Sequence, residues 1–254
     1  MNDLIAIVRP PDNSYTKCIS NHPQKATIDI YKALSQHEKY VQCLKNLGCK
    51  IIELPALKER PDSCFVEDRC VIAGDKAAIC PSHVNSRKKE ESAIIKLIST
   101  YKKIDFIQRP GYIDGGDIII IGDTLYGGLS KRSNLNGLKQ LANILDKELV
   151  VIKIPSKVLH LKTISSFIGS NTIFVREDLN HLWKDKGFNV VKVPMKEEHA
   201  ANCIAIGNKI IVPAQSTETI NFLNKLKYEI FEVDMSEFQK GDGSLTCLSL
   251  IFEF

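Results

Sequence analysis

A two-residue turn, a glycine followed by a small polar residue, recurs four times along this chain of 254 residues, each time between two apolar runs. The four turns are Gly74-Asp75, Gly122-Asp123, Gly169-Ser170 and Gly207-Asn208, and their glycines lie 48, 47 and 38 residues apart. A glycine-polar pair flanked by apolar, β-rich runs is typical of a β-hairpin. A hairpin that returns at such regular intervals predicts a repeat architecture.

Between the hairpins the apolar pattern changes to a helical one. Apolar residues recur with the spacing of an amphipathic helix over residues 26–47, 86–101, 132–147 and 216–227, with a weaker pattern over 176–186. A short β-rich run follows each of these segments: Ile51–Leu54, Ile104–Ile107, Leu149–Ile152, Val190–Val193 and Ile230–Val233. The repeating unit is therefore a hairpin, a helix and a strand.

Five such units around an axis would make a five-bladed α/β propeller, with strands near the axis and helices outside. The last hairpin is expected at Thr246–Phe254, and the first strand, Leu4–Val8, would close the ring. No long linker rich in proline, glycine and serine interrupts the chain, so we expect one domain over residues 1–254. The competing layout, a solenoid, would need polar capping repeats, and the sequence shows none.

Composition narrows the class of protein. Lys and Arg number 34 against 30 Asp and Glu, and this mixed surface with a net charge of +4 does not indicate a nucleic-acid binder. No apolar run approaches the ~18 residues of a membrane helix, and the N-terminus lacks the apolar stretch of a secretion signal. The eight cysteines include no C-x-x-C pair, so no structural zinc or other metal is expected. A reducing, cytoplasmic setting with free thiols fits this pattern best.

Each hairpin follows a short segment that carries polar side chains, here called a lead-in segment. The five lead-in segments are Cys64–Asp68, Tyr112–Asp117, Val158–Lys162, His199–Cys203 and Asp242–Cys247. Because a repeated unit presents the same position at the same place each time, we expect these side chains to gather at one point. The gathered set would hold carboxylates, one histidine and one cysteine.

Three residues of this set could do chemistry together. Taken alone, Cys247 would be core packing in a terminal strand, but at the start of the fifth hairpin its thiol could face a pocket as a nucleophile. His160, at the start of an apolar strand, could be a structural histidine or the general acid/base for Cys247. Asp114 could belong to a turn, orient His160 or pair with a cationic ligand. A metal site of cysteine, histidine and acids is less favoured, because no tight ligand spacing is present.

Charged residues nearby indicate a charged ligand. Glu67 and Asp68 are neighbours, so in a strand their carboxylates would point to opposite faces, and a buried one would need a partner. A planar guanidinium suits a carboxylate, because two N–H groups can meet two oxygens. Asp62 lies just upstream of this pair. Arg87 and Arg132 are expected at the starts of two helices, where a cation opposes the helix dipole and hints at a bound anion. Display on the surface is the alternative for each of them.

Six motifs resemble, in order, those of the dimethylarginine dimethylaminohydrolase family within the guanidino-group-modifying pentein superfamily. They are Phe65–Asp68, Asp114–Asp117, Gly128–Asn134, Leu159–Lys162, Ala200–Ile204 and Asp242–Cys247, and they cover most of the chain. The resemblance implies the pentein fold, a five-bladed α/β propeller. It also implies an enzyme that works without a cofactor.

The resemblance assigns roles to residues as well. Cys247 would be the nucleophile, His160 the acid/base and Asp114 the third catalytic member. Asp68 and Glu67 would hold a substrate guanidinium. The implied contacts to the rest of the substrate come from Asp62, Arg87, Arg132 and Asp242, and from Ile19 in a mobile flap over residues 15–27.

The implied reaction is hydrolysis of an Nω-methylated arginine to citrulline and methylamine or dimethylamine, through a covalent S-alkylthiouronium on Cys247. A second interpretation is arginine deimination, or hydrolysis or amidino transfer with another substituted guanidine. A third is a non-catalytic binding module similar to the ribosome anti-association factors. The expected partner is a small-molecule guanidine, bound by a monomer or a homodimer, with no nucleic acid and no membrane involved.

Overall fold

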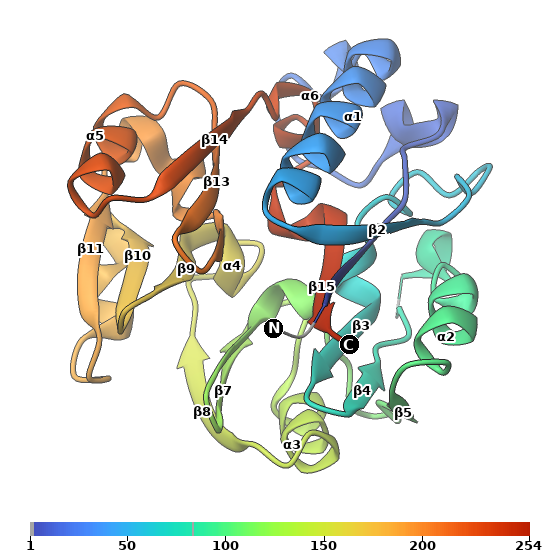
Figure 1. Cartoon of the computed structure of the whole chain (residues 1–254). Coiled ribbons are helices and arrows are strands. Elements are labelled where there is room, and N and C mark those ends of the chain that lie inside the picture. The colour runs from blue at the N-terminus through green and yellow to red at the C-terminus, as the bar shows by residue number, and fades with distance from the viewer. Residues whose placement is uncertain (1–2, 83) are drawn as a thin grey trace.

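A computed structural model describes residues 3–82 and 84–254. In them the strands form five sheets of three strands each, with the orders β15-β1-β2, β3-β4-β5, β6-β7-β8, β9-β10-β11 and β12-β13-β14. The sheets are arranged around a central axis with helices on the outside (Figure 1). This architecture confirms the five-bladed α/β propeller that the repeat predicts.

The strands are short. They are β1 (Leu4–Val8), β2 (Cys49–Glu53), β3 (Cys70–Ala73), β4 (Lys76–Ile79), β5 (Lys103–Phe106), β6 (Ile118–Ile121), β7 (Thr124–Leu129), β8 (Glu148–Lys153), β9 (Ser165–Gly169), β10 (Thr172–Arg176), β11 (Asn189–Val193), β12 (Ile204–Ile206), β13 (Lys209–Pro213), β14 (Glu229–Val233) and β15 (Ser249–Glu253). Strands β3, β6, β9, β12 and β15 are the inner strands, because their residues line the axial cavity.

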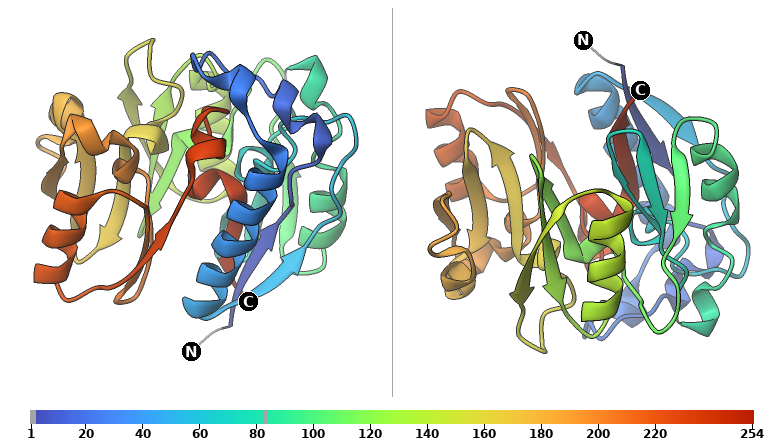
Figure 2. Two further views of the ribbon diagram at one scale, coloured as in Figure 1. Left: turned by 90° about the horizontal axis from the view of Figure 1, so that it is seen from above. Right: turned by 90° about the horizontal axis from the view of Figure 1, so that it is seen from below.

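The helical segments are of two kinds. The α-helices are α1 (Ile30–Asn46), α2 (Ser92–Ile98), α3 (Leu135–Ile144), α4 (Leu161–Ile164), α5 (Thr217–Lys225) and α6 (Ser236–Gln239). The 3₁₀ segments are η1 (Asn13–Lys17), η2 (Lys25–Thr27), η3 (Val66–Arg69), η4 (Asn85–Arg87), η5 (Gly115–Asp117), η6 (Glu177–Trp183), η7 (Met195–Ala201) and η8 (Thr246–Leu248). Figure 2 shows from two sides that α1 (blue) and α3 (yellow-green) cover the outside of the body.

Four units follow the predicted order of hairpin, helical segment and strand along the chain. In the second unit, for example, β6 and β7 pair antiparallel, and β8 returns after α3 to pair parallel with β7. Gly74, Gly122 and Gly207 in the hairpin turns have φ angles of +57°, +58° and +60°. This left-handed conformation favours glycine because a Cβ would crowd the backbone. The turn chemistry read from the sequence therefore has a direct structural cause.

The fifth unit differs from the prediction. Residues 246–254 do not form a hairpin of their own, because β15 pairs antiparallel with β1, from Leu4 opposite Glu253 to Val8 opposite Ser249. Strand β2 then pairs parallel with β1, which completes a unit shared between the two ends of the chain. The expectation that the first strand closes the ring is confirmed, and the predicted fifth hairpin is wrong.

The outer helices are shorter than predicted. Helix α1 begins at Ile30, after its N-cap Asp29 accepts hydrogen bonds from the backbone of Tyr31 and Lys32. Helix α2 begins at Ser92, six residues after the predicted start, and η6 replaces a full α-helix in the third unit. The apolar pattern marked the right segments, but the helix ends depend on caps and turns that the pattern does not contain.

The lead-in segments also differ from the prediction of strand starts. Short helical turns, here called lead-in turns, precede the five inner strands: η3, η5, α4, η7 and η8. Contacts between neighbours link them around the axis in the order η8, η3, η5, α4 and η7. The polar side chains of the lead-in segments are thereby brought to one end of the axis, as the repeat predicts.

Apolar side chains fill the space between the sheets and the outer helices. Helix α1, for instance, buries Ala33, Tyr40, Val41 and Leu44 against residues of the fourth and fifth units. The eight cysteines are all free. Within the described residues, none of the helices has the length and apolar character needed to cross a membrane.

Candidate active site

The structure brings the predicted nucleophile and the predicted acid/base to one pocket. Cys247 lies in the lead-in turn η8 and His160 is the N-cap residue of α4. Both line a small cavity of about 20 Å³ together with Asp68 of η3. The convergence expected from the repeat is therefore present, although the side chains start from helical turns and not from strands.

His160 lies between two carboxylates. Its Nδ1 is 3.5 Å from Asp117 Oδ2, and its Nε2 is 3.9 Å from Asp68 Oδ1. Burial lowers the pKa of His160, but the charges of Asp117, Asp68 and Asp114 outweigh burial and raise this pKa to about 9. An imidazole in this setting is protonated at neutral pH, so it can donate a proton to a leaving group.

Asp68 is buried and charged. Burial opposes its ionisation, but Arg87, His160 and Arg69 together hold the pKa of Asp68 below its ordinary value. One of its oxygens, Oδ2, accepts a hydrogen bond of 2.7 Å from Arg87 Nη1. The other, Oδ1, is buried and accepts none among the described residues. That free acceptor in the pocket is suited to a cationic ligand.

Arg87 does not stand where the sequence predicted it. It ends η4, five residues before α2, and its guanidinium is buried. Its donors already reach Asp68, Glu90 Oε2 at 3.0 Å, and the carbonyl oxygens of Asp62 and Phe65. The anions beside Arg87 are therefore the protein's own carboxylates, and the helix-dipole argument for it is wrong.

Arg132 is the less committed of the two arginines. It also lies outside its helix, two residues before the N-cap Asn134 of α3. Its side chain is 17% exposed at the pocket, and its Nη1 lies 3.6 Å from Asp114 Oδ2. It can therefore meet an anionic group of a ligand more readily than Arg87 can.

Asp114 lies behind the pocket and is not among its lining residues. Its carboxylate pairs with the buried Arg69, whose guanidinium also donates to Cys80 O, and it lies next to Arg132. The carboxylate nearest to His160 Nδ1 is Asp117, which the sequence analysis did not assign. The signal was present, because Asp117 ends the same Asp-Gly-Gly-Asp motif and is fully buried.

Asp117 is itself held firmly. Ser130 Oγ and Ser133 Oγ donate to its Oδ2 at 2.6 and 2.7 Å, and the backbone N–H of Leu161 donates to Oδ1 at 3.0 Å. Leu161 follows His160 in the chain, so this last hydrogen bond ties the histidine's own turn to η5. Asp117 is thus placed both to stabilise the protonated form of the imidazole and to hold the imidazole in position.

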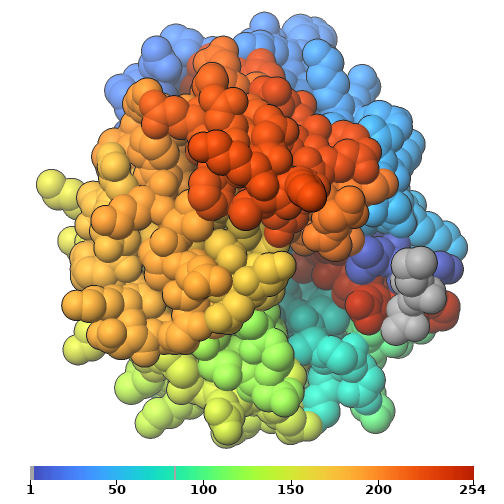
Figure 3. Space-filling view, turned by 60° about the vertical axis from the view of Figure 1, so that its left-hand side comes forward, coloured from blue at the N-terminus to red at the C-terminus, as the bar shows by residue number. Residues whose placement is uncertain are grey.

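Glu67 does not lie in the pocket with Asp68. In a 3₁₀ turn successive side chains diverge by about 120°, and Glu67 points instead to Lys162 Nζ at 2.6 Å and Thr246 Oγ1 at 2.8 Å. It lines a second, axial cavity of about 360 Å³. Figure 3 shows the surface hollowed where segments of several units meet. Glu67 therefore does not line the pocket that Asp68 shares with Cys247 and His160.

Ile19, Asp62 and Asp242 also line the small pocket. Asp62 Oδ1 accepts from the backbone N–H of Ile19 at 3.0 Å, and Asp242 Oδ2 accepts from that of Asn21 at 2.9 Å. These bonds fasten the segment over residues 15–27 across the site. A volume of about 20 Å³ holds no more than a water molecule, so the pocket in this structure has no room for an arginine-sized ligand.

The thiol of Cys247 is neutral in this setting. Burial, followed by the negative charges of Glu67 and Asp68, raises its pKa well above that of a free cysteine. A cation placed beside the sulfur would reverse the electrostatic part of this effect. The pocket thus combines a thiol that a cation would activate with carboxylates that would hold the cation.

A group of potential metal ligands coincides with this site. Asp68, Asp114 and His160 place ligand atoms within 4.8 Å of one another in the described residues. Arg87 and Arg69 already neutralise the two carboxylates, and the raised pKa of His160 favours its protonated form. A metal needs a deprotonated imidazole, so the arrangement suits an organic cation better.

Comparison with protein families gives one result over nearly the whole chain. The model of the family described as "N,N dimethylarginine dimethylhydrolase, eukaryotic" matches residues 8–253. The chain is 34% identical over 252 residues to the N(G),N(G)-dimethylarginine dimethylaminohydrolase of Pseudomonas aeruginosa, covering 97% of this chain and 98% of the relative. It is 30% identical over 249 residues to the protein of the same name from Streptomyces coelicolor, covering 96% and 95%.

Solved structures agree with this result. The Pseudomonas aeruginosa enzyme, as a cysteine-to-serine variant complexed with citrulline, superposes with a TM-score of 0.93 at 32% identity, covering 99% of this chain and 100% of that one. The N-terminal domain of ArgZ, a cyanobacterial arginine dihydrolase, superposes with a TM-score of 0.86 at 18% identity, covering 98% and 97%. At that identity the second likeness concerns the fold alone.

Proposed function

Because the chain belongs to the dimethylarginine dimethylaminohydrolase family, whose members are hydrolases of guanidino C–N bonds, we propose that it converts Nω-methylated arginines to citrulline and methylamine or dimethylamine. The observation that carries the proposal is the shared pocket of Cys247, His160 and Asp68. We further propose that residues 1–254 act as a single catalytic domain.

Binding of the guanidinium is assigned to Asp68. Its Oδ1 lacks a hydrogen-bond donor, and so does Asp62 Oδ2 in the same pocket, as far as the described residues go. A guanidinium offers several N–H donors in one plane and can satisfy such acceptors. Arg132, partly exposed at the pocket, is assigned to the substrate carboxylate.

The first chemical step is displacement of the amine. Cys247 releases its proton to the solvent when the cation binds, and its sulfur attacks the central guanidinium carbon. As the C–N bond breaks, its electron pair stays with the departing nitrogen, which takes the proton of His160 and leaves as methylamine or dimethylamine. The product of this step is an S-alkylthiouronium on Cys247.

Water completes the reaction. His160, now neutral, takes a proton from a water molecule that attacks the same carbon. The C–S bond then breaks, its electron pair returns to the sulfur, the proton of the added hydroxyl group passes to the sulfur so that the thiol is restored, and citrulline is released. Support for a covalent step comes from a histidine-to-glycine variant of a dimethylarginine dimethylaminohydrolase, which was solved as an adduct with S-methyl-L-thiocitrulline and superposes with a TM-score of 0.93.

Two alternatives make different products or none. Arginine deimination would release ammonia, and amidino transfer would pass the amidino carbon to an added amine. A non-catalytic binding module would release nothing. Such a module would have no use for a protonated imidazole and an unpaired carboxylate oxygen beside a thiol, which is why we favour catalysis.

The test is a substrate panel of arginine, monomethylarginine, asymmetric dimethylarginine and agmatine, with the released amine identified by mass spectrometry. We expect methylamine and dimethylamine from the two methylated arginines, and weaker turnover of agmatine, which has no carboxylate for Arg132. Cys247→Ser should lower turnover by on the order of a thousandfold, whereas Cys43→Ser, at another partly exposed thiol, should leave it unchanged.

Ammonia from arginine as the preferred product would replace the proposal with deimination. Undiminished citrulline formation by a folded Cys247→Ser variant would remove the nucleophile assignment. Circular dichroism of each variant serves as the check on folding.

A further inference from the structure

One of the five lead-in segments contributes nothing to the proposed chemistry. The fourth, residues 199–203, supplies neither a nucleophile nor an acid or base to the pocket. It does supply Asn202, whose side chain is almost fully buried, at 1% exposure. A buried amide needs partners for its donors and its acceptor, and the partners of Asn202 indicate what it does.

Asn202 joins the segments that carry the two reactive groups. Its Nδ2 donates to Lys162 O at 2.8 Å and to Thr246 Oγ1 at 3.0 Å, and its Oδ1 accepts from the backbone N–H of Thr246 at 3.0 Å. Thr246 directly precedes Cys247, and Lys162 is two residues after His160. One side chain therefore contacts both the turn of the thiol and the turn of the imidazole.

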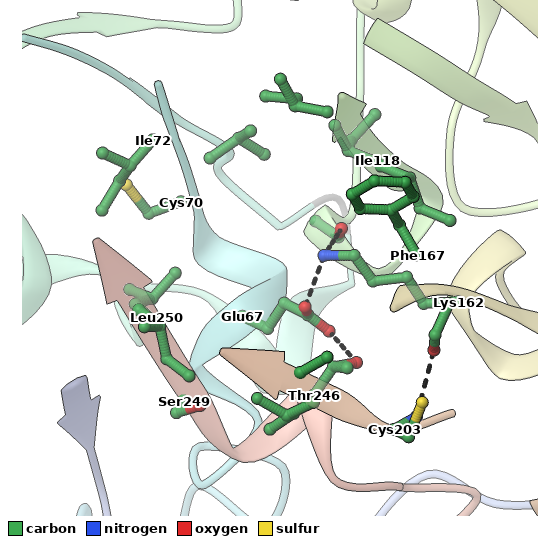
Figure 4. A pocket seen from close by; sticks show the side chains of 18 residues that line it. Glu67, Cys70, Ile72, Ile118, Lys162, Phe167, Cys203, Thr246, Ser249 and Leu250 are labelled. Atoms are coloured by element: carbon green, nitrogen blue, oxygen red, sulfur yellow. Dashed lines mark hydrogen bonds and ion pairs between the residues drawn. The ribbon is translucent and has the colours of Figure 1, made fainter. Parts of the chain in front are cut away.

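The remaining lead-in segments complete this arrangement into a ring across the axis, here called the axial ring: Glu67, Gly115, Lys162, Asn202 and Thr246. Thr246 Oγ1 donates to Glu67 Oε2 at 2.8 Å, and Lys162 Nζ donates to Glu67 Oε1 at 2.6 Å and to Gly115 O at 3.4 Å. Figure 4 shows Glu67 between Lys162 and Thr246, seen from the axial cavity. Glu67, Gly115, Lys162 and Thr246 of the ring line that cavity, and their chain neighbours Asp68, His160 and Cys247 line the small pocket.

We propose that Asn202 is a positioning residue, which holds the Cys247 turn against the His160 turn through the axial ring. This proposal rests on the proposed function. Its physical basis is that η8 is a single 3₁₀ turn of three residues, and such a turn is too short to fix its own orientation. Displacing a reacting atom by ~1 Å can slow a reaction about a hundredfold, so the turn needs an external anchor.

The hydrogen bonds of Asn202 run in a chain that favours one arrangement. The amide donates to the Thr246 hydroxyl, which donates to Glu67, which also accepts from Lys162. Each donor in such a chain is strengthened by the next, and the ammonium–carboxylate pair at its end is charge-assisted. Loss of Asn202 would leave the Thr246 N–H, the Thr246 hydroxyl and Lys162 O to rearrange independently.

The experiment compares Asn202→Ala with Glu197→Ala. Glu197 lies in η7, the turn whose C-cap residue is Asn202, and it is also buried. Its carboxylate also makes three hydrogen bonds, which it accepts from Glu218 N, Thr219 N and Thr219 Oγ1 at 2.8–2.9 Å. Those bonds point outward to α5 and not to the axis. Glu197→Ala should therefore lower the stability of the fold about as much as Asn202→Ala does, while the hydrogen bonds of the axial ring stay in place.

We expect Asn202→Ala to lower kcat by ~10- to 100-fold with KM changed by less than about threefold, since the pocket residues assigned to substrate binding are untouched. Glu197→Ala should keep kcat within about twofold at a comparable melting temperature. Thr246→Val should lower kcat as well, and adding it to Asn202→Ala should cost less than the two losses multiplied, because they act on the same anchor. Thr246→Ser, which keeps the hydroxyl, should restore most of the activity.

A readout that needs no substrate separates this proposal from the proposed function. Labelling of Cys247 by iodoacetamide, followed by peptide mass, should be faster by about threefold or more in Asn202→Ala than in Glu197→Ala. If the wild type turns over no methylated arginine, the proposed function fails and this labelling ratio still decides the role of Asn202. Equal kcat in the two variants, or equal labelling where no turnover exists, would overturn the assignment.

Discussion

At the scale of single residues, the protonation states in the pocket depend on which charged side chains are buried next to one another. Asp68 and Asp114 are each paired with an arginine, yet Asp68 keeps one oxygen without a donor. His160 is protonated beside them, while burial, followed by the charges of Glu67 and Asp68, keeps the neighbouring thiol neutral. In the proposed function, the site therefore binds a cation first, and the reactive thiolate forms only when that cation is present.

The raised pKa of His160 has a measurable consequence for stability. The pKa is about 9 in the folded chain and ~6.5 for an unperturbed histidine, so the native state binds the proton more tightly. Its contribution is fully present below pH ~6.5 and is lost as the pH rises through about 9, by on the order of 3 kcal/mol.

We therefore expect the difference in free energy of unfolding between the wild type and His160→Gln to shrink between pH 6 and pH 10. Urea unfolding at a series of pH values would measure this difference, and using the difference cancels the titration of groups common to both proteins. A gap that stays constant over this range would mean that folding does not raise the pKa of His160.

At the scale of elements, the lead-in turns determine which side chains meet. A helical turn before each inner strand rotates its side chains out of the strand's alternation, so that Asp68 enters the pocket and Glu67 enters the axial ring. The turns also pack closely on one another. A Cβ added to Gly116 in η5 would lie 2.9 Å from the His160 ring, closer than side chains tolerate.

Gly116→Ala should therefore displace the imidazole and lower kcat by about tenfold or more. The matched control is Gly74→Ala in the first hairpin turn, where an added Cβ meets open space but the φ of +57° is strained. This control should lower the melting temperature and leave kcat near that of the wild type. Steady-state kinetics and thermal unfolding of both variants test the expectation, which fails if the two lose activity alike.

At the scale of the whole molecule, the propeller is closed by its own ends. Strands β15 and β1 pair along their whole length, and the backbone N–H of Phe254 donates to Asp3 O at 2.9 Å. The labels N and C stand next to each other in Figure 1. The lead-in turns and the small pocket lie at one end of the inner strands, here called the pocket end of the propeller. The hairpin turns lie at the opposite end, here called the hairpin end.

Circular permutants can test whether the two ends of the propeller differ in this way, because the chain termini lie next to each other. Joining residue 254 to residue 3 by a short linker and opening the chain between Gly122 and Asp123 should give a folded protein with kcat within about threefold of the original. Opening it instead between Gly115 and Gly116, in η5, should abolish activity. Comparable activity in both permutants, or none in the first, would contradict the expectation that the chain can be opened at the hairpin end but not at the pocket end.

Much of this protein follows from short-range pattern. The glycine turns, the alternation of hairpin, helix and strand, and the number of units are visible in the sequence, because turn conformation and amphipathic spacing are local properties. The order of the motifs that resemble the family is also visible, because each motif is a contiguous run of residues. The pairing of Cys247 with His160 was predicted from their positions in the repeat and from that resemblance. The helix ends were predicted only approximately. The fifth hairpin and the placement of Arg87 and Arg132 at helix starts were predicted wrongly.

The residues themselves determined the repeat and the list of groups that meet at its axis. Only the tertiary structure decided which partners these groups have. Asp68 lines the pocket and Glu67 belongs to the axial ring, while Asp117 lies beside the imidazole and Asp114 beside two arginines. Arg87 is already paired with the protein's own carboxylates, and Arg132 is partly exposed. The physical reason is that a side chain's partner depends on which neighbouring turns it packs against, and those turns come from units far away in the chain.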